Sequence, residues 1–185
     1  LLSSLVKQYS LSSFLEIGFG RGYASICVAK AFDELNSNGT VTTLDLKFDQ
    51  QHLALMKQVF PMPWLKRLTL HEGKSSETLK LLQNTSPKFD LVYIDGDHTH
   101  DGVKSDWELC KSMASRFVLF DDYHLPTKDS GPGIQVAKFI DSVDWAAEGF
   151  GEPILIKTDR RIFFDDRRIS DDDLDAGQVL VERKQ

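Results

Sequence analysis

A glycine-rich turn between an apolar run and a helical pattern is the first feature of the sequence that could do chemistry. Glu16 and three glycines, Gly18, Gly20 and Gly22, follow the apolar residues at 14–15 and precede the helical pattern. Glycine permits turn dihedrals that are closed to other residues, and it lets a ligand approach the main chain closely. The strand, turn and helix together predict a binding site for a nucleotide-type cofactor.

The spacing of the turn and its acidic neighbour indicate which cofactor this is. Dinucleotide sites use the pattern G-x-G-x-x-G, with the pyrophosphate at the helix N-terminus. Here Gly22 comes one residue early, and Glu16 would repel a pyrophosphate but suits a ligand with an ammonium and a sulfonium, S-adenosylmethionine. Asp45 ends the next apolar run, where an acidic side chain can bind ribose hydroxyls. A glycine turn without a ligand would leave both acidic residues unexplained.

Length and charge limit the classes of protein that fit. The chain has 185 residues, of which 41% are hydrophobic, and this suffices for the core of one domain. We expect that domain at residues 1–165 and an acidic, polar, solvated tail at residues 166–185. A net charge of −6 without a basic cluster argues against nucleic-acid binding and favours a small-molecule substrate. The two cysteines are far apart in the sequence, which favours a reducing compartment such as the cytoplasm. We find no signal peptide and no apolar stretch of about 20 residues, so no membrane association is expected.

Short β-type runs alternate with helical ones along the chain. Strands are predicted near 13–18, 40–46, 66–71, 89–95 and 116–121, and helices near 22–34, 49–59, 75–83 and 102–113. This alternation predicts an α/β, Rossmann-like fold with a doubly wound, mostly parallel sheet, whose active site lies at the carboxyl ends of the strands. The apolar runs 154–156 and 162–164 predict a C-terminal antiparallel hairpin at one edge.

Carboxylates follow two neighbouring predicted strands. Asp95 ends the fourth strand, and Asp121 and Asp122 end the fifth. Three carboxylates at one sheet edge would repel one another in a cleft of low dielectric constant, and a bound divalent cation relieves that repulsion. Hard oxygen ligands favour Mg²⁺. We therefore expect a magnesium site here, although Asp122 could instead cap a loop while Asp95 only orients the cofactor or a helix.

Histidines near these carboxylates leave a second kind of metal site open. His98, His100 and His124 lie close to the aspartates in sequence. Imidazole ligands would favour Mn²⁺, Fe²⁺ or Zn²⁺ over Mg²⁺.

These segments together resemble a known family. The Glu-x-Gly-x-Gly-x-Gly turn at 16–22, Asp45, the Tyr-Ile-Asp-Gly-Asp-His segment at 93–98 and the Phe-Asp-Asp-Tyr-His segment at 120–124 are similar to those of class I S-adenosylmethionine-dependent methyltransferases. Within that superfamily the chain resembles the macrocin and other antibiotic-sugar O-methyltransferases, which are related to the catechol and caffeoyl-coenzyme A enzymes. The resemblance covers residues 13–165 and implies seven strands with the last one antiparallel.

The resemblance also implies roles for individual residues. The methionine moiety would be surrounded by Glu16, Gly18, Gly20 and Gly22. Asp45 would hold the ribose hydroxyls. The adenine would be contacted by Gly73, Ser75 and Ser76. Asp95 is expected beside the cofactor and, with Asp121 and Asp122, on the metal. His98 stands where relatives place a lysine general base, and its unperturbed pKa of about 6.5 suits that role. Asp97 is a second candidate base.

The implied reaction is metal-dependent transfer of the sulfonium methyl to a hydroxyl of a small molecule with neighbouring oxygens, such as a sugar diol, a catechol or a hydroxy acid. A metal-independent methyltransferase, a hydrolase-like enzyme and a non-catalytic S-adenosylmethionine-binding module are the alternatives. The loop 125–133 is either a lid over the substrate or an ordinary connection. A homodimer is the expected assembly if the chain is not a monomer.

Overall fold

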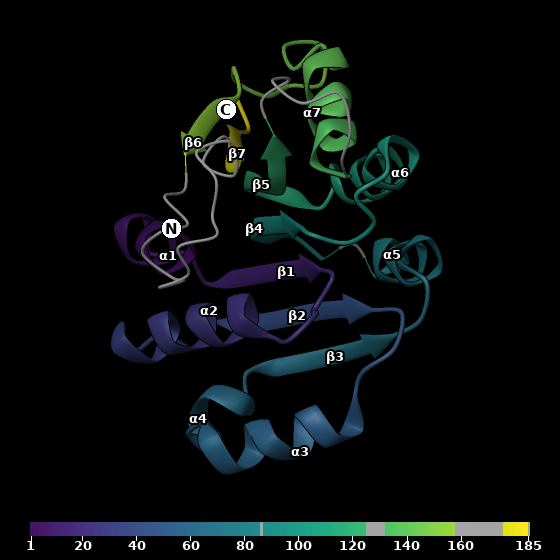
Figure 1. Ribbon diagram of the computed structural model, residues 1–185. Helices are drawn as coiled ribbons and strands as arrows, with labels where there is room; N and C mark the ends of the chain where they lie inside the picture. Colours follow the sequence, from purple (N-terminus) through teal and green to yellow (C-terminus); the bar gives the residue numbers. More distant parts are fainter. Residues whose placement is uncertain (86, 125–131, 158–175, 185) are drawn as a thin grey trace, which may run out of the picture.

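A seven-stranded sheet forms the centre of the computed structural model, which describes residues 1–85, 87–124, 132–157 and 176–184 (Figure 1). The strands are β1 (Ser13–Ile17), β2 (Thr40–Asp45), β3 (Leu68–Glu72), β4 (Phe89–Ile94), β5 (Ala114–His124), β6 (Ile154–Lys157) and β7 (Ala176–Glu182). Their order is β3-β2-β1-β4-β5-β7-β6. The first five pair in parallel, and β7 runs antiparallel to both β5 and β6. The predicted fold class is confirmed, including the antiparallel last strand.

Helices cover both faces of the sheet. They are α1 (Leu2–Tyr9), α2 (Tyr23–Glu34), α3 (Gln50–Val59), α4 (Met62–Leu65), α5 (Ser75–Asn84), α6 (His100–Cys110) and α7 (Pro132–Ser142). Figure 1 shows α1 and α2 on one side of the sheet, α5, α6 and α7 on the other, and α3 with α4 beside β3. The four predicted helices are confirmed, whereas the short α4 follows Pro61 and was not predicted. None of the described helices is long and apolar enough to cross a lipid bilayer.

The alternation of side chains along the strands assigns each residue to one of two apolar layers. In β4, Leu91 and Tyr93 join the cluster under α1 and α2, while Val92 and Ile94 join the cluster under α5, α6 and α7. Successive strand residues point to opposite faces, so Glu16, two residues after Phe14 of the first layer, faces α2. A carboxyl group is thereby directed into the interior at the carboxyl end of β1.

Glu16 is 1% exposed and lies beneath the glycine turn rather than in open solvent. The hydroxyls of Ser25, on α2, and Thr43, on β2, both donate hydrogen bonds to Oε2 of Glu16, the latter at 2.7 Å. Burial raises the pKa of Glu16 to about 7, Asp95 adds to the rise, and the two hydroxyl donors oppose it. The residue therefore connects α2, β1 and β2 through one buried carboxyl.

The C-terminal pairing differs from the predicted hairpin. β6 forms at Ile154–Lys157 as expected, but it pairs with β7, which lies in the segment predicted to be a solvated tail. Val179 is 2% exposed and Val181 is fully buried, because β7 is inserted between β5 and β6. Residues 176–182 therefore belong to the sheet and not to a solvated tail.

Two other expected segments lie partly or wholly outside the described residues. The second predicted hairpin strand, 162–164, is one of them. The predicted lid, 125–133, is described only at its last two residues, where α7 begins.

Truncating β7 tests whether the C-terminal segment belongs to the core. We expect Val181→Ala to lower the free energy of unfolding by about 2 kcal/mol, because it removes two fully buried methyl groups. The matched control is Ile154→Ala on the edge strand β6. Because Ile154 is 57% exposed, this substitution should lower the free energy of unfolding by less than about 0.5 kcal/mol. Urea unfolding measures both changes in unfolding free energy. If both variants lost the same small amount, β7 would not be part of the core.

The buried carboxyl of Glu16 makes stability depend on pH. Its pKa in the folded protein, about 7, exceeds the ordinary 4.5, so the folded state retains a proton that the unfolded state loses as the pH rises between these values. Relative to Glu16→Gln, the wild type should lose about 2.5 kcal/mol of unfolding free energy between pH 5 and pH 8. Urea unfolding of both proteins at the two pH values gives this difference directly. A constant difference would show that Glu16 is ionised in the folded protein at both pH values.

Candidate functional site

The glycine turn after β1 brings the ends of β1 and β4 into main-chain contact. A Cβ atom at Gly18 would lie 2.0 Å from the carbonyl oxygen of Asp95, and the φ of Gly18 is +94°, so only glycine fits there. A Cβ at Gly22 would lie 2.4 Å from the ring of Phe19. At Gly20 a Cβ would meet no atom within 4 Å, since this residue borders open space. Gly18 thus permits main-chain contact, Gly22 permits the packing of Phe19, and Gly20 borders open space.

A cleft of about 580 Å³ opens at the carboxyl ends of the parallel strands. Most of the predicted cofactor residues line it, namely Gly18, Gly20, Asp45, Gly73, Ser75, Ser76 and Asp95. Glu16 and Gly22 are not among the lining residues, because the first is buried beneath the turn and the second packs on Phe19. Several residues of the same wall were not predicted, including Leu46, Gly96, Ser105 and Asp106. No motif marks them, and the one signal that could have identified Asp106 is a charged residue at helical spacing between the apolar Val103 and Cys110.

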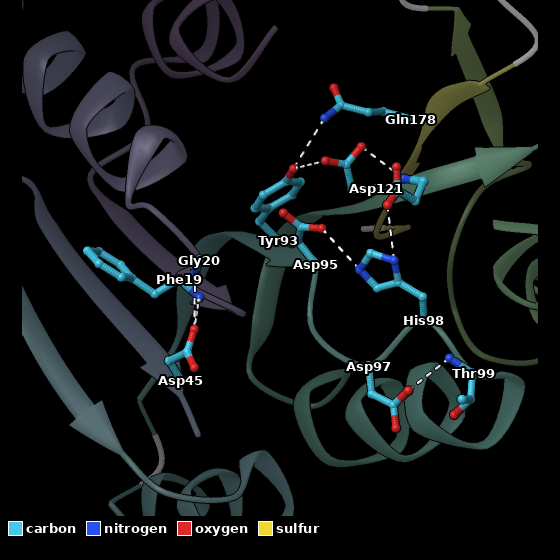
Figure 2. Close-up of polar contacts among 11 residues, drawn as sticks. Phe19, Gly20, Asp45, Tyr93, Asp95, Asp97, His98, Thr99, Asp121 and Gln178 are labelled. Carbon is cyan, nitrogen blue, oxygen red and sulfur yellow. Dashed lines mark hydrogen bonds and ion pairs between the residues drawn. The ribbon is translucent and has the colours of Figure 1, made fainter. Parts of the chain in front are cut away.

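Asp45 holds the glycine turn in place as well as facing the cleft. Its Oδ2 atom accepts hydrogen bonds from the main-chain N–H groups of Phe19 and Gly20, each at 3.0 Å, as Figure 2 shows. Its Oδ1 atom accepts a third from the N–H of Lys47 at 3.2 Å. The carboxylate is therefore fixed between the end of β2 and the turn, at the position where its ribose contact is predicted.

Asp95, which lines the cleft, meets His98 and Asp122, which are not among the lining residues. Nδ1 of His98 lies 3.0 Å from Oδ2 of Asp122, and Nε2 lies 3.5 Å from Oδ1 of Asp95. One potential ligand atom from each of the three lies within 4.8 Å of the others, a spacing that a metal ion could share. The structure thus gathers two of the three predicted metal ligands and adds the predicted base to them.

Asp121 is turned away from this group. The hydroxyl of Tyr93 donates a short hydrogen bond to its Oδ2 atom, and the N–H of Asp122 donates to its Oδ1 atom at 2.9 Å. The side-chain amide of Gln178, on β7, donates to the Tyr93 oxygen at 3.4 Å, so the three side chains form a chain in Figure 2. Burial and the Asp121 charge raise the pKa of Tyr93, which keeps its hydroxyl protonated as a donor.

The pairing with two carboxylates changes the chemistry of His98. Hydrogen bonds to Asp122 and then to Asp95 raise the pKa of His98 to about 10, while burial raises the pKa of Asp95 and His98 opposes that rise. While both carboxylates accept from it, His98 is an imidazolium at neutral pH. Its predicted role as a base therefore depends on its separation from the two carboxylates.

The remaining candidates lie outside the group of Asp95, His98 and Asp122. Oδ1 of Asp97 accepts from the N–H of Thr99 at 2.9 Å, at the start of α6, and Figure 2 shows Asp97 apart from the imidazole. His100 lies 3.1 Å from Asp101 and stands edge-on to Phe139. The side chain of His124 is outside the described residues. Among the described residues, His98 is therefore the one histidine in the candidate metal site.

Comparisons with known proteins agree with this architecture. Residues 15–123 match a family model described as a methyltransferase domain. No curated protein is significantly similar in sequence. The solved O-methyltransferase from Bacillus cereus in complex with SAH shares 20% identity at a TM-score of 0.70, with 99% of this chain and 79% of that one covered.

Two further solved structures have the same fold. TomG, an O-methyltransferase from Streptomyces achromogenes involved in tomaymycin synthesis and in complex with SAM, shares 19% identity at a TM-score of 0.72, covering 100% of this chain and 78% of that one. A Staphylococcus aureus protein described as a caffeoyl-CoA O-methyltransferase shares 19% identity at a TM-score of 0.63, covering 98% and 80%. The family match spans more than half of the chain, so the chain belongs to the methyltransferase domain family and has the class I fold predicted from its sequence.

Proposed function

We propose that this methyltransferase transfers the methyl group of S-adenosylmethionine to a hydroxyl oxygen of a small molecule, with a divalent cation held beside the donor. One observation carries the proposal, which is that Asp95 belongs to two sites. It lines the cleft beside the glycine turn, and it also lies with His98 and Asp122 in the candidate metal site. A donor in the cleft would therefore have its reacting end next to groups that can orient an acceptor.

The charge and shape of the cleft fit the proposed donor. Asp45 and Asp95 place carboxylates in its wall, and these favour a cationic ligand over a pyrophosphate. Gly20 leaves open space beside the turn, where a ligand can approach the main chain. The similar structures from Bacillus cereus and Streptomyces achromogenes are of O-methyltransferases in complexes with SAH and SAM, which supports both the donor and the oxygen acceptor.

The donor atoms near Asp95 suit a divalent cation. Asp95 and Asp122 would hold the ion, and either His98 or Asp121 would complete the ligand set. An imidazole ligand would shift the preference toward Mn²⁺, Fe²⁺ or Zn²⁺, whereas an oxygen-only set would favour Mg²⁺. When bound, such a cation supplies positive charge that lowers the pKa of a coordinated hydroxyl and orients it.

The transfer itself is a substitution at the methyl carbon. The acceptor oxygen forms a bond to that carbon while the carbon–sulfur bond breaks, and the electron pair of the broken bond stays on sulfur to give S-adenosylhomocysteine. The hydroxyl proton leaves to a base, for which we propose a nitrogen of His98 once it is free of its carboxylate partners, with Asp97 as the alternative. Most of the acceleration comes from orientation, because the sulfonium is already an activated donor.

The acceptor is expected to carry neighbouring oxygens, as in a sugar diol, a catechol or a hydroxy acid, because such a pair can chelate a cation. A cytoplasmic location and a possible homodimer remain predictions from the sequence.

A metal-independent methyltransferase is the second candidate function. It is favoured by the position of His98, whose two ring nitrogens already face both carboxylates and whose single positive charge offsets part of their negative charge. In this alternative the imidazolium takes the place of the cation.

Metal removal separates these two candidates. With a diol or catechol acceptor and S-adenosylmethionine, we expect EDTA to abolish methyl transfer and added Mg²⁺ or Mn²⁺ to restore it. We expect Asp95→Asn to lower kcat by at least about 100-fold with an unchanged unfolding midpoint, because its side chain is 32% exposed. Activity that persists in EDTA would replace the metal-dependent mechanism by the metal-independent one.

Direct Mn²⁺ titration, followed by electron paramagnetic resonance, identifies the third ligand. If His98 binds the ion, His98→Ala should weaken Mn²⁺ binding by about 10-fold or more while Asp121→Asn changes it little. The reverse pattern would identify the oxygen-only site predicted from the sequence. Asp101→Asn is the control for the loss of one negative charge, because it removes an exposed carboxylate of α6 that is not part of the candidate metal site.

A further inference from the structure

Asp106 is a buried aspartate in the wall of the cleft to which the proposed reaction assigns no role. It lies on α6 and is 2% exposed. Its helix neighbours Val103, Trp107 and Cys110 belong to the apolar core under α5, α6 and α7. A carboxyl group in such surroundings is costly unless polar partners compensate for its lost hydration. The contacts of Asp106 therefore indicate what the site is built to receive.

One oxygen of Asp106 has a partner in the protein and the other reaches the cleft. The hydroxyl of Ser75, the first residue of α5, donates to Oδ1 at 2.6 Å. None of the described residues donates a hydrogen bond to Oδ2. A Cβ atom at Gly96 would lie 3.2 Å from Oδ2, so the absence of a side chain there leaves the space before this oxygen open. Ser75, Gly96 and Asp106 all line the cleft.

Oδ2 is not an atom sealed inside the core. In the described part of the chain, only Arg67 Nε is a fully enclosed side-chain nitrogen or oxygen without a hydrogen-bond partner. Oδ2 of Asp106 also lacks a donor among these residues but is not fully enclosed, so it is accessible from the cleft. Burial raises the pKa of Asp106 to about 6, the charge of Asp97 acts in the same direction, and the Ser75 hydrogen bond opposes it. Near neutral pH the group is mostly a carboxylate, with one oxygen available to a donor in the cleft.

The position of Asp106 along the cleft indicates which part of a ligand it meets. Asp45 ends β2, and the segment Gly73–Ser76 follows β3, so the wall around Ser75 lies beyond the predicted ribose position. Leu46 is 69% exposed and lines the same cleft, where it offers an apolar surface to a flat ring. If the ligand is S-adenosylmethionine, as the proposed function requires, the group here is the adenine, whose exocyclic donor is its 6-amino group.

We propose that Asp106, positioned by Ser75, accepts a hydrogen bond from the 6-amino group of the donor's adenine and makes the site select adenosyl over inosyl ligands. Inosine carries an oxygen in place of this amine, so two acceptors would face each other and the buried carboxylate would lose its partner. Sites that hydrogen-bond a ligand group discriminate strongly against analogues that lack it, because the site's own polar atoms are left unpaired.

Binding of two product analogues tests the inference without a substrate. Calorimetry gives the dissociation constants of S-adenosylhomocysteine and S-inosylhomocysteine, which differ at position 6 of the base and in the proton that the inosyl compound carries on the adjacent ring nitrogen N1. We expect the wild type to bind the inosyl compound at least about 30-fold more weakly. Asp106→Asn should reduce the ratio to about threefold or less, because the amide can present either its oxygen to an amine or its N–H₂ to a 6-oxo group.

Two control variants separate a specific contact from a structural role. Ser105→Ala changes a neighbouring residue of the cleft wall, and Asp101→Asn makes the same chemical change at an exposed position of α6. Both should keep the wild-type ratio. If Asp106→Asn weakened both ligands equally, or if the wild type bound both equally, the inference would be overturned. Equal binding of both ligands by the wild type would overturn the inference even if the variant fails to fold.

A failure of the proposed function would look different. In that case neither analogue would bind at millimolar concentration, and the inference about Asp106 would fall with it. Binding of S-adenosylhomocysteine with no preference over the inosyl compound would overturn the inference alone.

Discussion

The close approach of main chain at the carboxyl ends of β1, β2 and β4 is the constraint on which the site depends. The N–H of Gly18 donates to the carbonyl of Leu44, and the N–H of Asp95 donates to the carbonyl of Ile17, so the parallel pairing continues past the ends of the strands. There is no room for a side chain at Gly18 in this arrangement. Because the three strand ends are held together, Asp45 and Asp95 stand on opposite sides of one turn.

The carboxylates around the cleft have hydrogen-bond or ion-pair partners within the protein. Asp45 binds main-chain N–H groups of the turn, Asp121 binds Tyr93, and Asp97 binds the N–H of Thr99. The pair formed by Asp95 and Asp122 shares His98. The repulsion among these acidic groups is therefore relieved locally, by donors that a cationic ligand or a metal ion would have to replace or supplement.

Much of the fold follows from local sequence signals. Residues 91–94 of β4 and 117–120 of β5 are continuous apolar runs, as expected for strands that are covered on both faces, and the helices between the strands carry clear apolar stripes. The position of the last strand in the sequence escaped prediction because Val179, Leu180 and Val181 form only a short apolar run in a polar region. Their burial depends on insertion between β5 and β6, and local composition does not record a long-range pairing of this kind.

The sequence by itself determined the glycine turn, the order of strands and helices, and the aspartates at the strand ends, because each depends on the chemistry of a few adjacent residues. Only the tertiary structure decided that Glu16 is buried, that Asp121 turns to Tyr93, and that His98 joins Asp95 and Asp122. It also brought Asp106 to the cleft through Ser75, which lies 31 residues away in the chain. The directions and partners of side chains are set by packing between distant segments, and this information is absent from the spacing within any one motif.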